Sequence, residues 1–518
     1  MENKTEIEFT KNIKCAQVFT DSAAEYVLPD YNGDVRKILH TSAEVRPSGK
    51  FAGGDEIEVS GIVVYEVIYL DEENKLTSVS FTSDYDYSVK CSSENYIDSF
   101  AESAVSNYAL RLVGPRKISA KASVVGSVRI AESDKVTVEG NTFDSDETPE
   151  TMNRRFSIRK SVASECRERE YAESLAKLDG AIADEVSVIS SSADAVIDEI
   201  EAGDGEVTLR GNLTLSAIIK NGDLPAYQRE KILPIEETLP FADVSETMRF
   251  VPEITVGSLV TNINASDMGT EVVISAVIES SVVGESNEEG ELVADAYLKR
   301  CAVENKYEDF PYSELSSVVY SRETENGAVA RSEIEAENVR EVLHLKATPK
   351  IDSVICDNGR LTVSGELKYS GIASVTDAEG APCYVPMKFS LPFERSLEVK
   401  SGDALLPEVR VKAHNAGATF DASKLYASCL LEISAVVTEE KHLKRLSASS
   451  KIPDETFEDN ASRIVIYYPG AEENLFSIAK KYRTTALKIA SDNALDAKVI
   501  ADADGKSLPA GAKKLLIY

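Results

Sequence analysis

Side chains that could do chemistry are abundant in this sequence, but their spacing forms no catalytic pattern. The 518 residues include 88 Asp and Glu, 7 Cys and 4 His. Paired acids such as Glu236-Glu237 and Glu472-Glu473 could act in glycoside hydrolysis if two carboxylates converged in a cleft. The sequence has no phosphate-binding loop, no Gly-x-Ser-x-Gly elbow and no His-Glu-x-x-His motif. We therefore expect no enzyme and no cofactor, and a hydrolase stays as an alternative.

Two of the four histidines occupy matching places. His40 and His344 each lie 21 residues before a strand glycine, and Ser190 lies at the same distance before a third glycine. The preceding residues are apolar, and a histidine beside an apolar face is more often structural than a ligand. We expect this position to flank a strand.

The cysteines give no metal or disulfide signal. Their number is odd, none forms a Cys-x-x-Cys pair, and no Cys/His group has zinc spacing. This pattern favours a reducing compartment, and no secretory signal or membrane-spanning run is predicted. The expected location is the cytoplasm, without membrane insertion.

The net charge is −32, which argues against a nucleic-acid partner because phosphate binding needs clustered Lys and Arg. Residues 464–518 carry eight Lys or Arg and six Asp or Glu, a net charge of +2, so the rest of the chain carries −34. A slightly basic end on an acidic body suits a protein that holds a partner at one end. The alternative is that acidity only keeps the protein soluble.

A repeat organises the body of the chain. Alternating apolar and polar residues surround Gly61, Gly211 and Gly365, which are 150 and 154 residues apart. Regular spacing of similar segments predicts tandem copies of one domain, and a strand glycine often marks a bulge or a close backbone approach. We expect mainly-β, sandwich-like or barrel-like copies over residues 31–143, 181–300 and 332–445.

Other segments of the body are expected to lie outside these copies. Residues 1–30 are predicted to form a leader with a short helix from Asp21 to Tyr26. A helix is predicted from Ser164 to Lys177, and Ser447 to Asn460 is predicted to be a linker.

Residues 464–518 predict a separate strand, helix, helix, strand unit of 55 residues, within a domain that we place at 463–518. A strand ends at Pro469-Gly470, and Asn474 can cap a helix with Leu475, Ile478, Ala479 and Tyr482 on one face. Thr484 is expected to cap a second helix, with Leu487 and Ile489 turned inward, before a closing strand.

This order of signals, with Ser477-Ile478-Ala479-Lys480-Lys481-Tyr482 and the final Leu508-Pro509-Ala510-Gly511, resembles a LysM domain. The resemblance implies a small α/β, non-catalytic binding domain that holds N-acetylglucosamine-containing glycans between two loops. The matching positions are Gly470, Glu472, Glu473, Asn474, Leu475, Asn493, Ala494 and Leu495. Four residues separate Gly470 from Leu475 where the family has two, so we expect this surface to be a docking face for a protein.

Three β-rich repeats before one LysM module resemble the SPOCS-domain proteins of endospore-forming bacteria, in particular the SipL type. The resemblance implies a multidomain spore coat morphogenetic scaffold in the mother cell, at the forespore surface. It also implies that the LysM module binds a coat morphogenetic ATPase, SpoIVA-like. The alternative is a protein of the cell wall or spore cortex that binds peptidoglycan.

Overall fold

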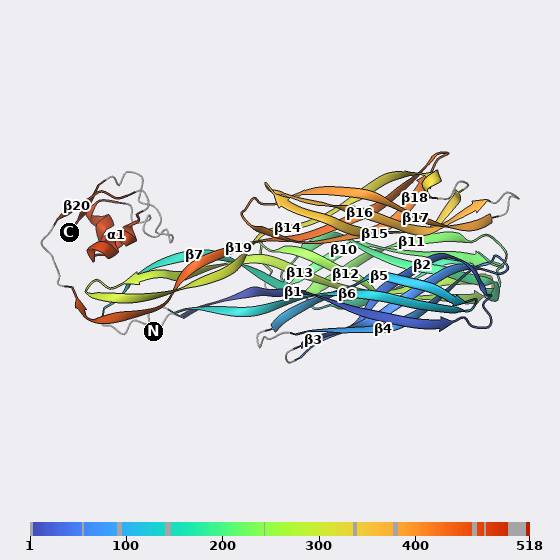
Figure 1. Ribbon diagram of the computed structural model, residues 1–518, viewed down its shortest axis with the longest axis horizontal. Helices are drawn as coiled ribbons and strands as arrows, with labels where there is room; N and C mark the ends of the chain where they lie inside the picture. The colour runs from blue at the N-terminus through green and yellow to red at the C-terminus, as the bar shows by residue number, and fades with distance from the viewer. Residues whose placement is uncertain are drawn as a thin grey trace.

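The chain folds mainly into long antiparallel strands. The computed structural model describes residues 4–53, 56–90, 96–139, 147–242, 244–334, 339–376, 382–457, 464–470, 473–495 and 514–518. The molecule is elongated: a body of strands narrows into ribbons, and a small helical module lies at the far end of the ribbons (Figure 1). Among the described residues, no helix has the length and apolar character needed to cross a membrane. The predicted mainly-β fold class is confirmed.

The first unit of the body consists of two three-stranded sheets. Its strands are β1 (Lys4–Val27), β2 (Val35–Gly53), β3 (Glu56–Asp71), β4 (Leu76–Lys90), β5 (Tyr96–Gly114) and β6 (Lys117–Glu139). One sheet has the order β2-β3-β4 and the other β1-β6-β5. The two sheets share one hydrophobic core, so the unit is a β-sandwich.

The second and third units repeat this strand order. The second unit contains β7 (Glu150–Ala163), β8 (Arg167–Asp179), η1 (Ala183–Glu185), β9 (Val186–Ala202), β10 (Glu206–Asn221), β11 (Tyr227–Pro240), β12 (Arg249–Ser266) and β13 (Gly269–Tyr297). The third unit contains β14 (Cys301–Ala330), η2 (Arg331–Glu333), β15 (Val339–Asp357), β16 (Arg360–Thr376), β17 (Pro382–Glu398), β18 (Leu405–Phe420) and β19 (Lys424–Thr456). The sheets β9-β10-β11 and β15-β16-β17 correspond to β2-β3-β4, and β8-β13-β12 and β14-β19-β18 correspond to β1-β6-β5.

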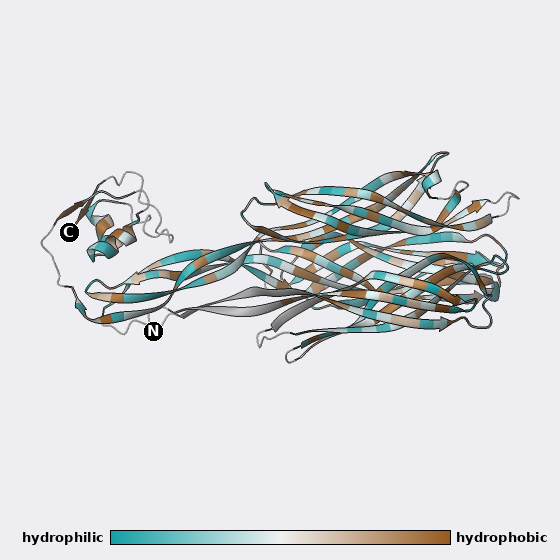
Figure 2. Cartoon of the chain, viewed as in Figure 1, coloured by the Kyte–Doolittle hydropathy of each residue, from teal (hydrophilic) through white to brown (hydrophobic). Residues whose placement is uncertain are grey.

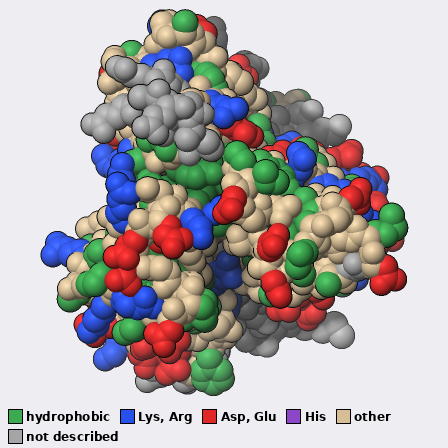
Figure 3. Space-filling view, turned by 90° about the vertical axis from the view of Figure 1, so that its right-hand side faces the viewer, with side chains coloured by type: hydrophobic (Ala, Val, Ile, Leu, Met, Phe, Trp, Pro, Cys, Tyr) green, Lys and Arg blue, Asp and Glu red, His purple; other side chains and the backbone are tan. Residues whose placement is uncertain are grey.

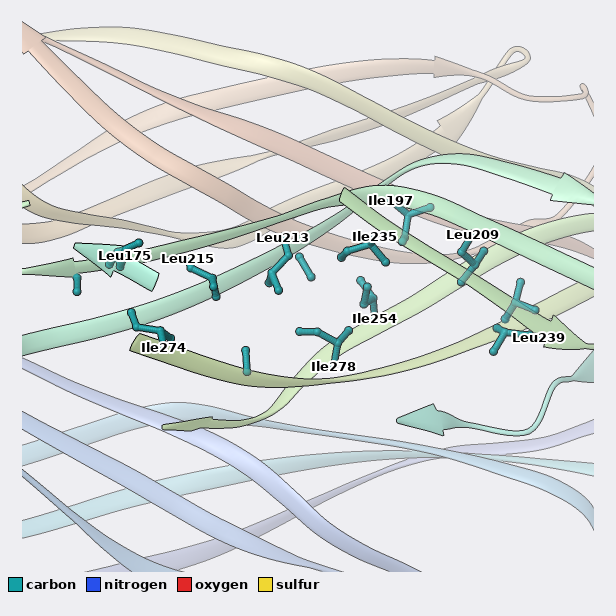
Figure 4. Packing of buried hydrophobic residues seen from close by; sticks show 14 of the residues in the cluster. Leu175, Ile197, Leu209, Leu213, Leu215, Ile235, Leu239, Ile254, Ile274 and Ile278 are labelled. Atoms are coloured by element: carbon teal, nitrogen blue, oxygen red, sulfur yellow. The ribbon is translucent and has the colours of Figure 1, made fainter. Parts of the chain in front are cut away.

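Period-two alternation builds each core. Leu209, Leu213 and Leu215 of β10 lie opposite Ile274 and Ile278 of β13 between the two sheets of the second unit (Figure 4). Apolar and polar residues alternate along most strands (Figure 2). A fully buried Leu or Ile contributes about 1.5–3 kcal/mol, so these paired faces hold each sandwich together.

The first strand of each unit was left outside the predicted copies, although alternation at Ile7 and Phe9 indicated a possible strand in the leader. The predicted leader and its helix from Asp21 to Tyr26 are the strand β1, and the helix predicted from Ser164 to Lys177 is the strand β8. The predicted linker from Ser447 is strand as far as Thr456. Each of the three predicted copy ranges therefore begins after a strand that pairs within that unit.

The glycine prediction is confirmed in all three units. Opposite Gly61, Gly211 and Gly365 the neighbouring strand carries one extra residue, which is Ser48, Asp198 or Asp352. A Cβ on any of these glycines would collide with a carbonyl oxygen of that strand. Only glycine allows the two backbones to approach so closely.

The C-terminal module, residues 464–518, pairs β20 (Val465–Tyr467) with β21 (Leu515–Ile517). Between them lie α1 (Leu475–Tyr482) and α2 (Ala486–Asp492). Asn474 caps α1 as predicted, because its side chain accepts a hydrogen bond from the Ser477 N–H. The cap of α2 is Thr485, not Thr484: Thr484 is buried, and its N–H donates to Ala479 O at the end of α1.

The two residues predicted to turn inward from α2 differ. Ile489 is buried, but Leu487 is 62% exposed, so the inward prediction is wrong for Leu487. The helix has only seven residues, and its buried positions are Ile489 and Ala490. A helix this short presents one narrow face to the module core, and Leu487 lies outside that face.

Candidate functional site

The module is held against the body through one face of α1. Tyr297, the last residue of β13, is completely buried among module residues, and its ring meets Phe476 edge-on at 5.2 Å. Its hydroxyl donates to Thr484 O at 2.6 Å. Burial raises the pKa of Tyr297, which keeps the phenol protonated as a donor.

Ionic contacts extend this junction. Lys480 Nζ lies 2.6 Å from Asp295 Oδ2 of β13, and Arg483 donates to Leu298 O at 3.3 Å. The Arg483 guanidinium also stacks over the Phe457 ring at 4.0 Å. The side of α1 that carries Phe476, Lys480 and Arg483 is therefore occupied by the body.

The first predicted binding loop uses its polar groups to hold itself together. The Glu473 carboxylate accepts hydrogen bonds from Tyr467 OH at 2.6 Å and from Gly470 N at 2.9 Å. The Gly470 N–H, with help from Tyr467, lowers the pKa of Glu473. Asn474 caps α1, and Leu475 is buried in the module core. Glu472 lies outside the described residues.

The second predicted loop behaves in the same way. The Asn493 amide donates to Ile489 O and Leu516 O at 2.7 Å, and its oxygen accepts from Leu516 N at 2.6 Å. Ala494 has a left-handed backbone with φ of 53°, and Leu495 packs in the same cluster as Leu475. The structure thus brings the two loops to one core, and the polar side chains described there already have partners: Glu473 and Asn493 within the module, and Asn474 both within it and at Met152 of β7.

The outer face of the β20–β21 sheet is the apolar surface that the sequence reading missed. Val465, Tyr467, Leu515 and Ile517 face the helices and are buried or half-buried. The alternate positions face solvent: Ile464 is 65% exposed, Ile466 53%, Tyr468 70% and Tyr518 49%. The run Ile464-Val465-Ile466-Tyr467-Tyr468 predicts a strand, but every position in it is apolar or aromatic. Because no polar residue marks the outward positions, the sequence does not show which side of the strand faces solvent.

The matched positions His40, Ser190 and His344 lie near one another in the body. Each follows an apolar residue, and those three residues, Leu39, Ile189 and Leu343, share one buried cluster. The rings of His40 and His344 are 5.4 Å apart. Within the described residues, no group of three or more His, Cys, Asp or Glu side chains could hold a metal ion.

Comparison of the chain with known proteins finds no matching family model, no matching curated protein and no matching solved structure.

Proposed function

We propose that this protein is a non-catalytic scaffold whose C-terminal LysM-like module docks a protein partner. The observation that carries the proposal is the exposed apolar outer face of the β20–β21 sheet, formed by Ile464, Ile466, Tyr468 and Tyr518. Clusters of exposed aliphatic and aromatic side chains are typical of protein interaction sites. We name these four residues the sheet face.

The fixed position of the module supports this role. The sheet face lies on the side of the sheet opposite the helices, and α1 is anchored to the body by Tyr297 and Asp295. A partner bound at the sheet face would be held at one end of a long molecule. Such geometry suits a scaffold that holds its partner at a distance from the body.

The state of the two loops favours a protein over a glycan as the ligand. A glycan presents hydroxyl and amide groups that need hydrogen-bond partners once they are buried. Glu473 and Asn493 already make their side-chain hydrogen bonds inside the module, and the Asn474 side chain accepts from Ser477 N and donates to Met152 Sδ of β7 in the body. The sheet face offers mainly apolar area, which buries best against another apolar protein surface.

The body supports a reading as three SPOCS-like repeats. The three sandwiches share one strand order, and each has a glycine opposite an extra residue at the same place. The resemblance to SPOCS and LysM proteins then suggests a spore coat morphogenetic role, with a SpoIVA-like coat ATPase as partner at the forespore surface. Peptidoglycan of the cell wall or spore cortex is the competing ligand.

A charge placed on the sheet face tests the proposal in the full-length chain. We expect Ile466→Glu to weaken binding to an immobilised SpoIVA-like ATPase at least about tenfold, because a carboxylate would be desolvated in an apolar contact. Leu487→Glu is the matched control, since Leu487 is equally exposed on α2 of the same module. We expect that control to bind within about twofold of the unmodified chain. Equal loss in both variants, or no loss in either, would contradict the sheet face as the docking surface.

A further inference from the structure

The three sandwiches close into a ring. The sheets β2-β3-β4, β9-β10-β11 and β15-β16-β17, which we call the inner sheets, meet at their edge strands: β4 lies against β9, β11 against β15, and β17 against β2. Seen end-on, the body has three lobes around a central hollow (Figure 3). Two of these junctions join consecutive units, whereas the β17–β2 junction joins the third unit to the first. We call this last junction the closing seam.

An extra residue at one place in each unit builds the centre of the ring. Between Ile38 and His40, and between Val342 and His344, the pairing with the neighbouring strand skips one residue. The same skip occurs in β9 at Ile189. A bulge of this kind re-aims its side chain, and the three skipped residues, Leu39, Ile189 and Leu343, are 2%, 4% and 0% exposed in one shared cluster.

The residue after each bulge stands next to this apolar centre. His40 is 3% exposed, and its ring meets that of His344 nearly at right angles, at 5.4 Å. Among the described atoms, His40 Nε2 has no hydrogen-bond partner. Burial, with His344 nearby, lowers the pKa of His40 to about 3, and burial lowers the pKa of His344 to about 4. Both imidazoles are therefore neutral when the seam is closed.

Charged groups surround the pair from several strands. Lys346 of β15 forms an ion pair with Glu44 of β2 across the closing seam. The positive charge of Lys388 of β17 also lowers the pKa of His40. Glu66 of β3 is hydrogen-bonded to Ser190 of β9, and burial raises the pKa of Glu66 to about 7. The positive charge of Arg46 of β2 also acts on Glu44 and Glu66, and the negative charge of Asp194 of β9 acts on Lys346. Beside these charged groups lie the apolar side chains of Ile68, Leu76, Ile218 and Ile372.

We propose that the His40–His344 contact is an acid-sensitive latch that opens the closing seam while the individual sandwiches stay folded. A proton on buried His40 would create a cation close to Lys346 and Lys388, and a proton on half-buried His344 would create one close to Lys346. A second proton would add repulsion between two cations with ring centres 5.4 Å apart. Opening relieves both costs, because the rings regain water.

The direction of the pH effect follows from these shifts. A histidine whose pKa is depressed in the closed form stabilises it above the usual pKa, and that stabilisation is lost as the pH falls below about 6.5. For each of the two histidines, the equilibrium constant for opening then rises by about 25-fold as the pH falls from 7 to 5. Glu66 acts in the opposite sense, because its pKa is raised in the closed form, and it favours closure by about 40-fold over the same range. The combined effect of the two histidines is larger than that of Glu66, so the opening constant should rise by about 15-fold in total.

The test uses the full-length chain and a variant that cannot take up these protons. The radius of gyration from small-angle scattering and the far-UV circular dichroism would be followed from pH 7 to pH 4.5. We expect the unmodified chain to expand in acid while its strand signal persists. In His40→Gln/His344→Gln only Glu66 remains, so the opening constant should fall by about 40-fold between pH 7 and pH 5, where that of the unmodified chain rises by about 15-fold.

Two further variants make the outcome decisive. His442→Gln is the matched control, because His442 is a 63%-exposed histidine on β19 that pairs with Asp309 away from the seam, and it should expand like the unmodified chain. If the double variant does not fold at pH 7, His344→Gln alone should change its opening constant by less than about twofold between pH 7 and pH 5, because His40 and Glu66 then nearly cancel. Expansion of the histidine variants at the same pH as the unmodified chain, or acid loss of the strand signal together with expansion, would overturn the latch.

Discussion

Single residues have two main structural roles in this protein: some let two strands approach closely, and others bind backbone groups with their side chains. Gly211 shows the first role, because Val196 O occupies the place where a Cβ would be. Asn493 shows the second, because its amide joins the end of α2 to β21. The role of Gly211 could be predicted from one strand, since glycine in an alternating run has few other uses. The role of Asn493 could not, because its partner Leu516 lies 23 residues away beyond a long connection.

The glycine role leads to a stability prediction. We expect Gly211→Ala to destabilise the second unit by at least about 2 kcal/mol, since the new methyl group must displace the β9 backbone. Denaturant unfolding of the full chain measures the change. Gly114→Ala is the control, because a Cβ there meets no atom within 4 Å, and it should change stability by less than about 0.5 kcal/mol. Equal effects in the two variants would contradict the close approach.

At the scale of elements, strand pairing overrides local helix preference. The segment Arg167–Asp179 is rich in Glu, Ala and Leu, which favour helix, yet it pairs with β13 about 100 residues later in the chain. One extra residue at Leu175 lets both Leu175 and Ala176 be buried, and this mimics helical spacing in the sequence. The helix was predicted because the partner strand, which decides the outcome, lies far away in sequence.

A buried ion pair joins two of these elements and reaches a third. Arg159 of β7 donates two hydrogen bonds to Glu285 of β13, each 2.7 Å long, and neither side chain is exposed. Arg159 Nη1 also lies 3.6 Å from Glu408 of β18 in the third unit. The pair therefore fixes the second unit's ribbon against the third unit.

We expect Arg159→Met to destabilise the protein by about 3–5 kcal/mol, because Glu285 would stay buried without its cation. The double variant Arg159→Met/Glu285→Leu should recover most of that loss, since both desolvated charges are gone. Chemical denaturation measures the double-mutant cycle. Arg210→Met, which removes an exposed arginine paired with Glu201 and Glu236, should change stability by less than about 1 kcal/mol. A double variant no more stable than Arg159→Met would contradict this reading of the pair.

At the scale of the whole molecule, three sandwiches form a ring and a basic module lies at the end of their ribbons (Figure 1). The strand glycines, 150 and 154 residues apart, predict three β-rich copies, and the mainly-β class is the part of that prediction that the structure confirms. Their spacing could not predict the ring or the anchoring of α1, since both depend on contacts between surfaces far apart in sequence. The predicted loop residues stay a prediction as a binding site, and the proposal of how the module binds rests on the exposed sheet face.

The most direct test of the proposed function is a comparison of two ligands for the full-length chain. The measurement is the fraction of protein that co-sediments with polymerised SpoIVA-like ATPase and, separately, with purified peptidoglycan. We expect retention by the ATPase that Ile466→Glu abolishes, and no retention by peptidoglycan beyond that of an unrelated acidic protein. Retention on peptidoglycan that N-acetylglucosamine oligomers displace, with none on the ATPase, would contradict the proposal and establish the module as a glycan binder.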